Sequence, residues 1–376
     1  MNEKTFCVNP WIALHYQFGQ GYNPCCVYAN TIPANNALEY AQSQDLATLK
    51  QQLLEGVPAK DCGICWQEEA QGYSSKRLRD NITYQQVFNA KFHSNLSLVT
   101  DQFVRYYVRL GNHCNLRCVT CNDFFSTGWI SENKKFLGKA EHQPIMIQKV
   151  DPIWQTLRDN AAGIGKIEFV GGEPFMMLEQ QQADLFKYLV DSGHSKHITL
   201  MYNTNGTRMP DEQLEYWPHF KQIDISLSMD GIGAQFEYMR YPADWTVFSA
   251  NLERYKQIEK VKLLIVHTTS VLNVGYLGDV HEFCTAQNLK VFYNIMHYPL
   301  LLDLHRAPPL TRQWIHSQLE KVNNPVIKNI QTQLSTQAPN RAQDILDYCN
   351  MLDQRRGNSL AQAFPELYEK LNADCR

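Results

Sequence analysis

The sequence lacks every element that would direct this chain into or through a membrane. Residues Met1 to Tyr16 contain no basic region followed by an apolar run and a small-residue cleavage site, as a signal peptide would. Nowhere do about 18 apolar residues follow one another, which is the length that a membrane-spanning helix needs. We therefore expect an unprocessed cytoplasmic protein that has no membrane as a partner.

The sequence also lacks a strong net charge, internal repeats and long low-complexity tracts. Its 35 Lys and Arg residues nearly balance 38 Asp and Glu residues, which leaves a formal net charge of −3. This balance supplies no overall field for a polyphosphate backbone and argues against nucleic acid as a partner. Hydrophobic residues make up 44% of the chain, which is typical of a folded protein. The length of 376 residues indicates two or three domains.

Six strand-like runs alternate with helix-like segments in the middle of the chain. The runs are Phe103–Leu110, Lys166–Val170, His197–Tyr202, Gln222–Leu227, Val261–Thr268 and Lys290–Met296. The helix-like segments are Val150–Asn160, Leu178–Asp191, Asp211–Trp217, Trp245–Ile258 and Tyr276–Gln287. Strict alternation favours right-handed crossovers and a parallel sheet. Six units are too few for the closed eight-stranded barrel, so we expect an α/β fold with an open, partial (β/α)6 TIM-like barrel.

The two ends of the chain do not follow this alternation. We expect residues 1–90 to form a small cysteine-rich domain, residues 91–308 the barrel, and residues 309–376 a helical region that caps it. The N-terminal part combines an aromatic segment, a Gly-rich turn and a helix-like stretch from Asp45 to Glu55. The pattern after Pro308 and Pro309 is helical, with Gly357 between its last two segments.

Cysteines are concentrated near the N-terminus, where eight of the eleven precede residue 122. A cytosolic chain of this size needs no disulfides, so clustered cysteines indicate metal or redox chemistry. Cys114, Cys118 and Cys121 share one loop after the first strand-like run. Three thiolates on one loop can hold one inorganic cluster, but they are one too few to close a four-iron cube. One iron would remain open for an exogenous ligand, whereas part of a structural zinc site is the alternative.

This C-x3-C-x2-C loop resembles that of the radical S-adenosylmethionine (SAM) superfamily, and three further segments extend the resemblance. They are Gly171-Gly172-Glu173-Pro174, Asn203-Thr204-Asn205-Gly206-Thr207 and Ser228-Met229-Asp230-Gly231. Each follows one of the next three strand-like runs, and ligands of barrel enzymes bind at the carboxyl ends of the strands. Each segment alone is an ordinary turn in most sequences, so the resemblance depends on their joint order.

The resemblance implies a cofactor, a reaction and roles for these residues. Cys114, Cys118 and Cys121 would hold a 4Fe–4S cluster, and Gly171 to Pro174 would bind the methionine part of SAM. Asn205, Ser228 and Asp230 would contact the nucleoside. We expect Glu173 to bind rather than to act as a general base, and Thr120 stands where the family often has an aromatic residue. An electron donor such as flavodoxin or ferredoxin would drive cleavage of SAM to a 5'-deoxyadenosyl radical, which abstracts hydrogen from the substrate.

A second set of cysteines is expected to form a second metal site. Cys7, Cys25, Cys62 and Cys65 offer four thiolates, with Cys26 as a spare or a substitute for Cys25. Their layout resembles the SPASM and twitch auxiliary-cluster domains, here placed before the barrel instead of after it. The resemblance implies a second, auxiliary 4Fe–4S cluster. A zinc knuckle is the alternative, because the C-x2-C spacing suits both metals.

Several polar residues are weaker candidates. His267, Thr268 and Thr269 end the fifth strand-like run, and Asn294 and His297 flank the sixth, so they are candidate substrate contacts or merely satisfied polar residues. Arg240 could pair with a carboxylate of cofactor or substrate, or form a surface salt bridge. The basic run from Lys76 to Arg79 favours a solvated face.

These observations predict a radical SAM enzyme that acts on a peptide, a protein or another sizeable substrate. No winged-helix-like segment for binding a leader peptide precedes Cys7, which weakens the peptide hypothesis. One alternative is a radical SAM enzyme that acts on a small metabolite or a nucleotide. Another is a non-catalytic, zinc-stabilised binding protein.

Overall fold

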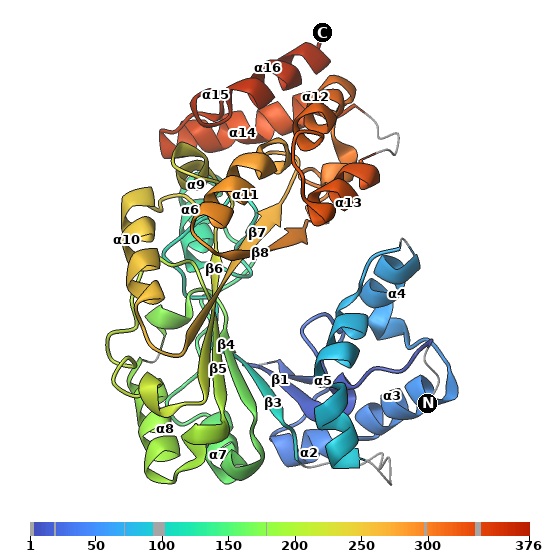
Figure 1. Cartoon of the computed structure of the whole chain (residues 1–376), viewed down its shortest axis with the longest axis vertical. Coiled ribbons are helices and arrows are strands. Elements are labelled where there is room, and N and C mark those ends of the chain that lie inside the picture. The colour runs from blue at the N-terminus through green and yellow to red at the C-terminus, as the bar shows by residue number, and fades with distance from the viewer. Residues whose placement is uncertain are drawn as a thin grey trace. The chain divides into compact units, whose positions relative to one another are not determined.

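The protein has an α/β fold, shown by a computed structural model in Figure 1. The structure describes residues 4–18, 20–70, 72–92, 102–177, 179–296, 299–334 and 340–376. Among these residues, no helix combines the length and the apolar character needed to cross a membrane.

An eight-stranded, mostly parallel sheet organises the chain. Its strands are β1 (Ala13–Gln17), β2 (Gly21–Asn23), β3 (Arg105–Arg109), β4 (Lys166–Val170), β5 (Thr199–Thr204), β6 (Gln222–Ser228), β7 (Val261–Thr269) and β8 (Lys290–Ile295). They lie in the order β2-β1-β3-β4-β5-β6-β7-β8. β1 pairs antiparallel with β2 and parallel with β3, and β3 with β4, β4 with β5 and β7 with β8 are parallel pairs.

The six predicted strands are present as β3 to β8, with ends that differ by at most two residues from the prediction. The expected helix over Asp211–Trp217 is wrong. That segment forms turns followed by the short 3-10 helix η5 (Trp217–His219). The segment is shorter than two helical turns and is flanked by Pro210 and Pro218, and proline disfavours a helical conformation of the residue before it.

The N-terminal region is not separate from the sheet, which corrects the sequence-based expectation. β1 extends the sheet next to β3, with His15 opposite Tyr107. Its burial pattern is that of an interior strand, because Ala13, Leu14, His15 and Tyr16 are all buried. The polar His15 and the brief run concealed this strand in the sequence, and its parallel partner lies about 90 residues further on in the chain.

Two compact units divide the described chain. The first comprises residues 1–111, 145–202 and 210–223, and the second comprises residues 112–144, 203–209 and 224–376. These units do not coincide with the three predicted domains, whose boundaries stay a prediction.

The first unit carries seven α-helices in the described residues. They are α1 (Asn9–Ile12), α2 (Ala37–Ala41), α3 (Gln44–Glu55), α4 (Gly63–Ala70), α5 (Lys76–Phe92), α7 (Pro152–Asp159) and α8 (Glu179–Asp191). A small apolar cluster joins α1 to α5, with the rings of Trp11 and Phe88 packed edge to face at 6.1 Å. This cluster fixes the segment that carries Cys7 against α5.

The second unit carries the remaining described α-helices. They are α6 (Thr127–Leu137), α9 (Ala234–Met239), α10 (Trp245–Lys256), α11 (Leu277–Ala286), α12 (Pro309–Leu319), α13 (Pro325–Gln333), α14 (Ala342–Arg356), α15 (Leu360–Ala363) and α16 (Pro365–Asp374). The region after Pro308 is therefore helical, and its helices α12, α14 and α16 lie together (Figure 1). Ser126 caps the N-terminus of α6, and Gly357 ends α14 in the left-handed conformation at φ 69°. Whether this region caps a barrel stays a prediction.

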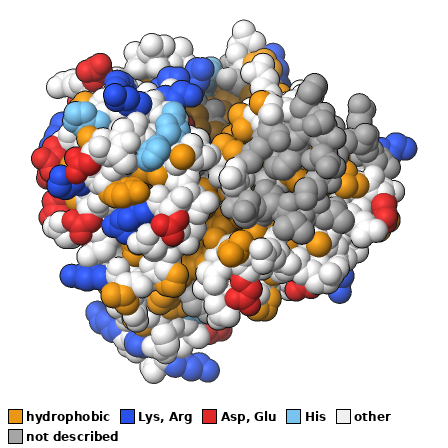
Figure 2. Space-filling view, turned by 90° about the horizontal axis from the view of Figure 1, so that it is seen from below, with side chains coloured by type: hydrophobic (Ala, Val, Ile, Leu, Met, Phe, Trp, Pro, Cys, Tyr) orange, Lys and Arg blue, Asp and Glu red, His pale blue; other side chains and the backbone are white. Residues whose placement is uncertain are grey.

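The surface in Figure 2 shows charged side chains of both signs interspersed among apolar and neutral ones. This mixture on the visible face agrees with the net charge of −3. A single-sign surface, which would concentrate polyanions by its field, is not seen on the described residues of this face.

Candidate functional site

The loop between β3 and α6 brings together the thiols of Cys114, Cys118 and Cys121. Burial raises the pKa of Cys121, and the neighbouring Cys118 and Cys114 raise it further, so the three sulfur atoms share one environment. Burial also raises the pKa of Cys118, although the charge of Arg240 acts to lower it. The predicted trio is therefore clustered, and its members need a cation to become thiolates together.

Main-chain hydrogen bonds fix this loop. The amide of Arg117 donates to the carbonyl of Tyr241 at 2.6 Å, and the amide of Val119 donates to the carbonyl of Met239 at 2.7 Å. The indole Nε1 of Trp129 donates to the carbonyl of Cys118 at 2.9 Å. With its backbone polar groups paired in this way, the loop can present its thiols in a defined arrangement.

Asn205 connects the loop to the turn after β5. Its Nδ2 donates to Oδ1 of Asn115 at 2.9 Å and lies 3.9 Å from Sγ of Cys114. Its Oδ1 accepts the amide of Thr207 at 2.9 Å, and Oγ1 of Thr207 in turn accepts from Nδ2 of Asn115 at 3.0 Å. Asn205 thus lies beside the cysteine trio, and these contacts show a role in ordering the loop that the motif did not predict.

Asp230 and Arg240 form a buried ion pair beside the same cysteines. Nη1 of Arg240 donates to Oδ2 of Asp230 at 2.7 Å, and Oδ1 of Asp230 accepts the amide of Thr268 at 2.8 Å. Arg240 is 7% exposed, so the alternative of a surface salt bridge is wrong. Ser228 ends β6 and is half-buried. Because both oxygens of Asp230 are engaged, its contribution at this site is to orient Arg240 as well as Thr268.

Among the described residues, two buried nitrogen atoms near Asp230 have no hydrogen-bond partner. They are Nε of Arg240 and Nε2 of His267. Nδ1 of His267 lies 2.9 Å from Oγ1 of Thr269, and burial lowers the pKa of His267 to about 4. Unpaired buried polar atoms are costly, and they are often explained by a ligand that the site binds. The other two candidates are less informative, because Asn294 is exposed and His297 lies outside the described residues.

The Gly-Gly-Glu-Pro segment belongs to the first unit, where it leaves β4. Gly171 has φ +126°, and a Cβ atom there would lie 2.6 Å from the carbonyl oxygen of Gly111. The amide of Gly172 donates to that same oxygen at 3.0 Å. Glu173 is fully buried, and its Oε1 accepts the amide of Phe175 at 3.2 Å. Pro174 begins the short helix η3 (Pro174–Met176). The segment is thus a tight turn with a buried carboxylate, which fits binding better than general base catalysis.

A second group of thiols lies in the first unit. Cys7 precedes α1, Cys25 follows β2, Cys62 ends the 3-10 helix η1 (Lys60–Cys62), and Cys65 lies in α4. Burial raises the pKa of Cys7 to about 12, with further contributions from Cys62 and Cys65. Burial also raises the pKa of Cys62 to about 12, helped by Cys25 and Cys65. Three segments distant in sequence, the last carrying both Cys62 and Cys65, therefore bring these four thiols together.

Cys25, not Cys26, belongs to this group in its contacts. Burial raises the pKa of Cys25, and both Cys26 and Cys7 add to the effect. Cys26 is exposed and does not contribute to the shifted pKa of Cys7 or Cys62. This arrangement favours Cys25 as the fourth ligand.

Both thiol groups fit an iron–sulfur cluster better than a zinc ion. Tetrahedral zinc with bonds of about 2.3 Å would hold its sulfur ligands about 3.8 Å apart. In the described residues, the only group of three or more possible ligand atoms within 4.8 Å of one another consists of Asp123, Glu141 and His142. No three cysteine sulfur atoms of these groups therefore lie within 4.8 Å of one another, a spacing that fits a cube of several atoms.

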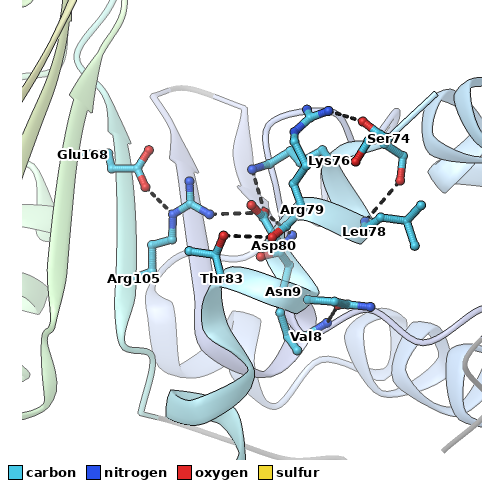
Figure 3. A network of polar contacts seen from close by, with 12 residues as sticks. Val8, Asn9, Ser74, Lys76, Leu78, Arg79, Asp80, Thr83, Arg105 and Glu168 are labelled. Carbon is cyan, nitrogen blue, oxygen red and sulfur yellow. Dashed lines mark hydrogen bonds and ion pairs between the residues drawn. The ribbon is translucent and has the colours of Figure 1, made fainter. Parts of the chain in front are cut away.

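A buried ionic network connects α5 to the sheet (Figure 3). Asp80 on α5 accepts from Nδ2 of Asn9 at 2.8 Å, from Nζ of Lys76 at 2.7 Å and from Nη1 of Arg105 at 3.3 Å. Arg105 on β3 also pairs with Glu168 on β4. Lys76 is partly buried, so the expectation of a solvated basic face is wrong at this position. No sequence pattern indicated this network, because its members lie on separate segments.

Other residues of the sites were also missed by sequence reasoning. They are His15, whose two ring nitrogens are buried without a hydrogen-bond partner in the described residues, and the loop contacts Asn115, Trp129 and Tyr241. Burial lowers the pKa of His15 to about 3. None of these residues belongs to a recognisable motif. A tryptophan just after a cysteine loop, such as Trp129, is a sequence signal for a residue that contacts the loop.

Comparisons with known proteins give one curated relative and several solved structures. No protein-family model matches the chain. The chain is 22% identical over 187 residues to the sporulation killing factor maturation protein SkfB of Bacillus subtilis (strain 168), a match that covers 49% of this chain and 40% of SkfB. The chain therefore spans less than half the length of this relative.

The solved structures are more distant. Native anSMEcpe with bound AdoMet and Kp18Cys peptide is 15% identical, with a TM-score of 0.41, over 67% of this chain and 62% of that one. Streptococcus suis SuiB bound to S-adenosylmethionine is 12% identical, with a TM-score of 0.38, over 89% of this chain and 69% of that one. SuiB has also been solved bound to its precursor peptide SuiA, with the same coverage.

Proposed function

The chain is, we infer, a radical SAM enzyme with a SPASM-type auxiliary site, and we propose that it modifies a peptide. The observation that carries this proposal is the cysteine trio of the second unit. Cys114, Cys118 and Cys121 lie on one loop, where Cys118 is buried and the other two are half-buried, and Cys118 and Cys114 both act on the thiol of Cys121. A trio without a fourth thiolate suits a four-iron cluster with one open iron.

The chain's own residues offer groups that would bind SAM. Gly171 and Gly172 allow close approach of the backbone, and the buried carboxylate of Glu173 suits an ammonium group. Arg240, oriented by Asp230, offers its unpaired Nε to a ligand. Ser228 and Asn205 complete the proposed nucleoside contacts. When bound, the reduced cluster supplies the electron that cleaves SAM to methionine and a 5'-deoxyadenosyl radical, which abstracts hydrogen from the substrate.

The second thiol group would hold an auxiliary 4Fe–4S cluster. Four protein ligands, Cys7, Cys25, Cys62 and Cys65, would leave no iron open, so electron transfer or structural support is the role that suits it. Lys76 lies near this group and acts on the thiol of Cys25 by its positive charge. That charge would offset part of the negative charge of a cluster with four thiolates.

A peptide is the proposed substrate, and a small flavodoxin- or ferredoxin-like protein is the proposed electron donor. The curated relative is named as a maturation protein for a killing factor, which suggests modification of a gene-encoded peptide. The alternative substrate is a small metabolite or a nucleotide, and the experiment below distinguishes it from a peptide.

The proposal is tested by anaerobic reconstitution of the full chain. We expect about eight iron atoms per chain, from two cubes, and release of 5'-deoxyadenosine when dithionite and SAM are added. Mass spectrometry of a peptide extract and of a small-molecule extract incubated with the enzyme then identifies the altered class. Zinc as the resident metal, or an absence of 5'-deoxyadenosine from iron-loaded protein, would contradict the proposal.

A further inference from the structure

The last long helix of the chain, α14, contacts the segment that carries the cysteine trio. Arg356, the final residue of α14, forms a buried ion pair with Glu132 of α6. Nη2 of Arg356 lies 3.1 Å from Oε1 of Glu132, and its Nε lies 3.2 Å from Oε2. Both side chains are 1% exposed. This pair joins two helices that lie 224 residues apart in sequence.

Arg356 also packs against the aromatic rings of two residues that contact the cysteine loop. The guanidinium carbon of Arg356 lies 4.7 Å from the ring centre of Trp129 and 5.3 Å from that of Tyr241. The indole of Trp129 donates to the carbonyl of Cys118, and the carbonyl of Tyr241 accepts from the amide of Arg117. Arg356 therefore packs against the rings of two residues that hold the loop, Trp129 through its indole at Cys118 and Tyr241 through its main-chain carbonyl at Arg117.

A second residue of α14 touches the loop directly. The hydroxyl of Tyr348 donates to the carbonyl of Val119 at 3.2 Å. Tyr348 lies about two helical turns before Arg356, so the two side chains extend from similar faces of α14. Arg117 adds a third element, since its Nη1 lies 3.6 Å from Glu132 and its guanidinium lies 4.9 Å from the ring of Tyr241.

Stability alone does not account for this arrangement. Removing two charges from water is costly, and well-packed apolar residues in their place are often as stable as a buried ion pair. The ion pair and its two aromatic neighbours instead fix the position of α14 against the cysteine loop.

We propose that Arg356 and Tyr348 of α14 are positioning residues that hold the cysteine loop in the arrangement needed to bind the catalytic cluster. This inference rests on the proposed function, because it requires a cluster on Cys114, Cys118 and Cys121. The C-terminal helical region would thereby contribute to the catalytic centre without touching substrate or cofactor.

Two variants test the proposal in the full, anaerobically reconstituted chain. Tyr348→Phe removes one hydroxyl, and Glu132→Met combined with Arg356→Met removes both charges of the pair while keeping the volume. The control is Arg355→Met, because the guanidinium of the neighbouring Arg355 lies over the ring of Phe136 instead. The readouts are the rate of iron loss to a chelator and the midpoint potential of each cluster, followed by electron paramagnetic resonance.

In both variants we expect the catalytic cluster to lose iron about fivefold faster, the factor that one ordinary hydrogen bond is worth. We expect little change in the midpoint potential of this cluster in the double variant, because one positive and one negative charge are removed together. The auxiliary cluster should behave as in the wild type and in Arg355→Met. Unchanged loss rates, or equal loss of both clusters, would overturn this inference. A wild-type protein without a catalytic cluster would instead contradict the proposed function.

Discussion

The carboxylate of Asp230 holds the guanidinium of Arg240 at 2.7 Å, with both side chains buried beside the cysteine trio. The superfamily motif assigns the aspartate to the nucleoside. The structure shows that its two oxygens are engaged by Arg240 and by the amide of Thr268. Each oxygen can accept a further hydrogen bond, so the nucleoside contact of Asp230 stays a prediction, and Asp230 also orients Arg240.

Asp230→Asn tests this relationship. Loss of the charge would leave Arg240 buried and uncompensated, which costs about 3–5 kcal/mol when one partner of a buried pair is removed. We expect a lower free energy of unfolding, measured with urea, and weaker SAM binding, measured by equilibrium dialysis. Asp244→Asn is the matched control, because Asp244 only caps the exposed start of α10 and asparagine caps equally well. Equal behaviour of the two variants would contradict the assignment.

Cys118→Ala tests the catalytic trio. We expect the variant to lose about four iron atoms per chain, keep the auxiliary cluster and form no 5'-deoxyadenosine. Iron analysis and chromatography of the reaction products give the two readings. Production of the nucleoside at the wild-type rate would remove Cys118 from the site.

Cys62→Ala tests the second thiol group. Loss of one of four ligands should again lower total iron by about four atoms, while the spectrum of the catalytic cluster remains. Cys26→Ala is the control, since Cys26 is exposed beside the group. Unchanged iron in Cys62→Ala, with zinc present in the wild type, would favour the zinc alternative.

Gly171→Ala tests the tight turn after β4. The added Cβ would lie 2.6 Å from the carbonyl oxygen of Gly111, at a backbone φ of +126°. We expect a loss of about 1–3 kcal/mol in unfolding free energy together with weaker SAM binding. Gly163→Ala is the control, because no atom lies within 4 Å of its added Cβ. Wild-type stability of Gly171→Ala would show that the turn adapts.

Because His267 is buried, we expect the stability of the protein to depend on pH. Burial lowers the pKa of His267 from 6.5 to about 4, so the folded protein keeps it neutral while the unfolded chain takes up a proton. The neutral, buried His267 therefore makes its full contribution to the free energy of unfolding above pH 6.5. As the pH falls from 6.5 toward 4, the free energy of unfolding decreases by about 3 kcal/mol. His267→Gln should flatten the decline of unfolding free energy between these values. His219→Gln, at an exposed position, should leave the slope unchanged, and an equal slope in both variants would contradict this account.

The sequence predicted those features that depend on local pattern. Alternating apolar runs located β3 to β8, and close cysteine spacing located the loop of Cys114. The sequence did not reveal β1, because its partner strand β3 is distant in sequence. The polar His15 also interrupts the apolar residues of β1. The contacts of Asp80 and of Arg356 were equally hidden, since each joins segments that only the folded chain brings together. Local spacing therefore located the proposed ligands, whereas the residues that contact them were found only in the structure.

The most direct test of the account concerns the iron that no cysteine holds. Electron–nuclear double resonance of the reduced, full-length protein, with SAM labelled at the methionine nitrogen and carboxylate, measures whether SAM contacts that iron. We predict a coupling to both labels in the wild type and its disappearance in Cys118→Ala. A reduced cluster that shows no coupling while labelled SAM is bound would contradict the central claim.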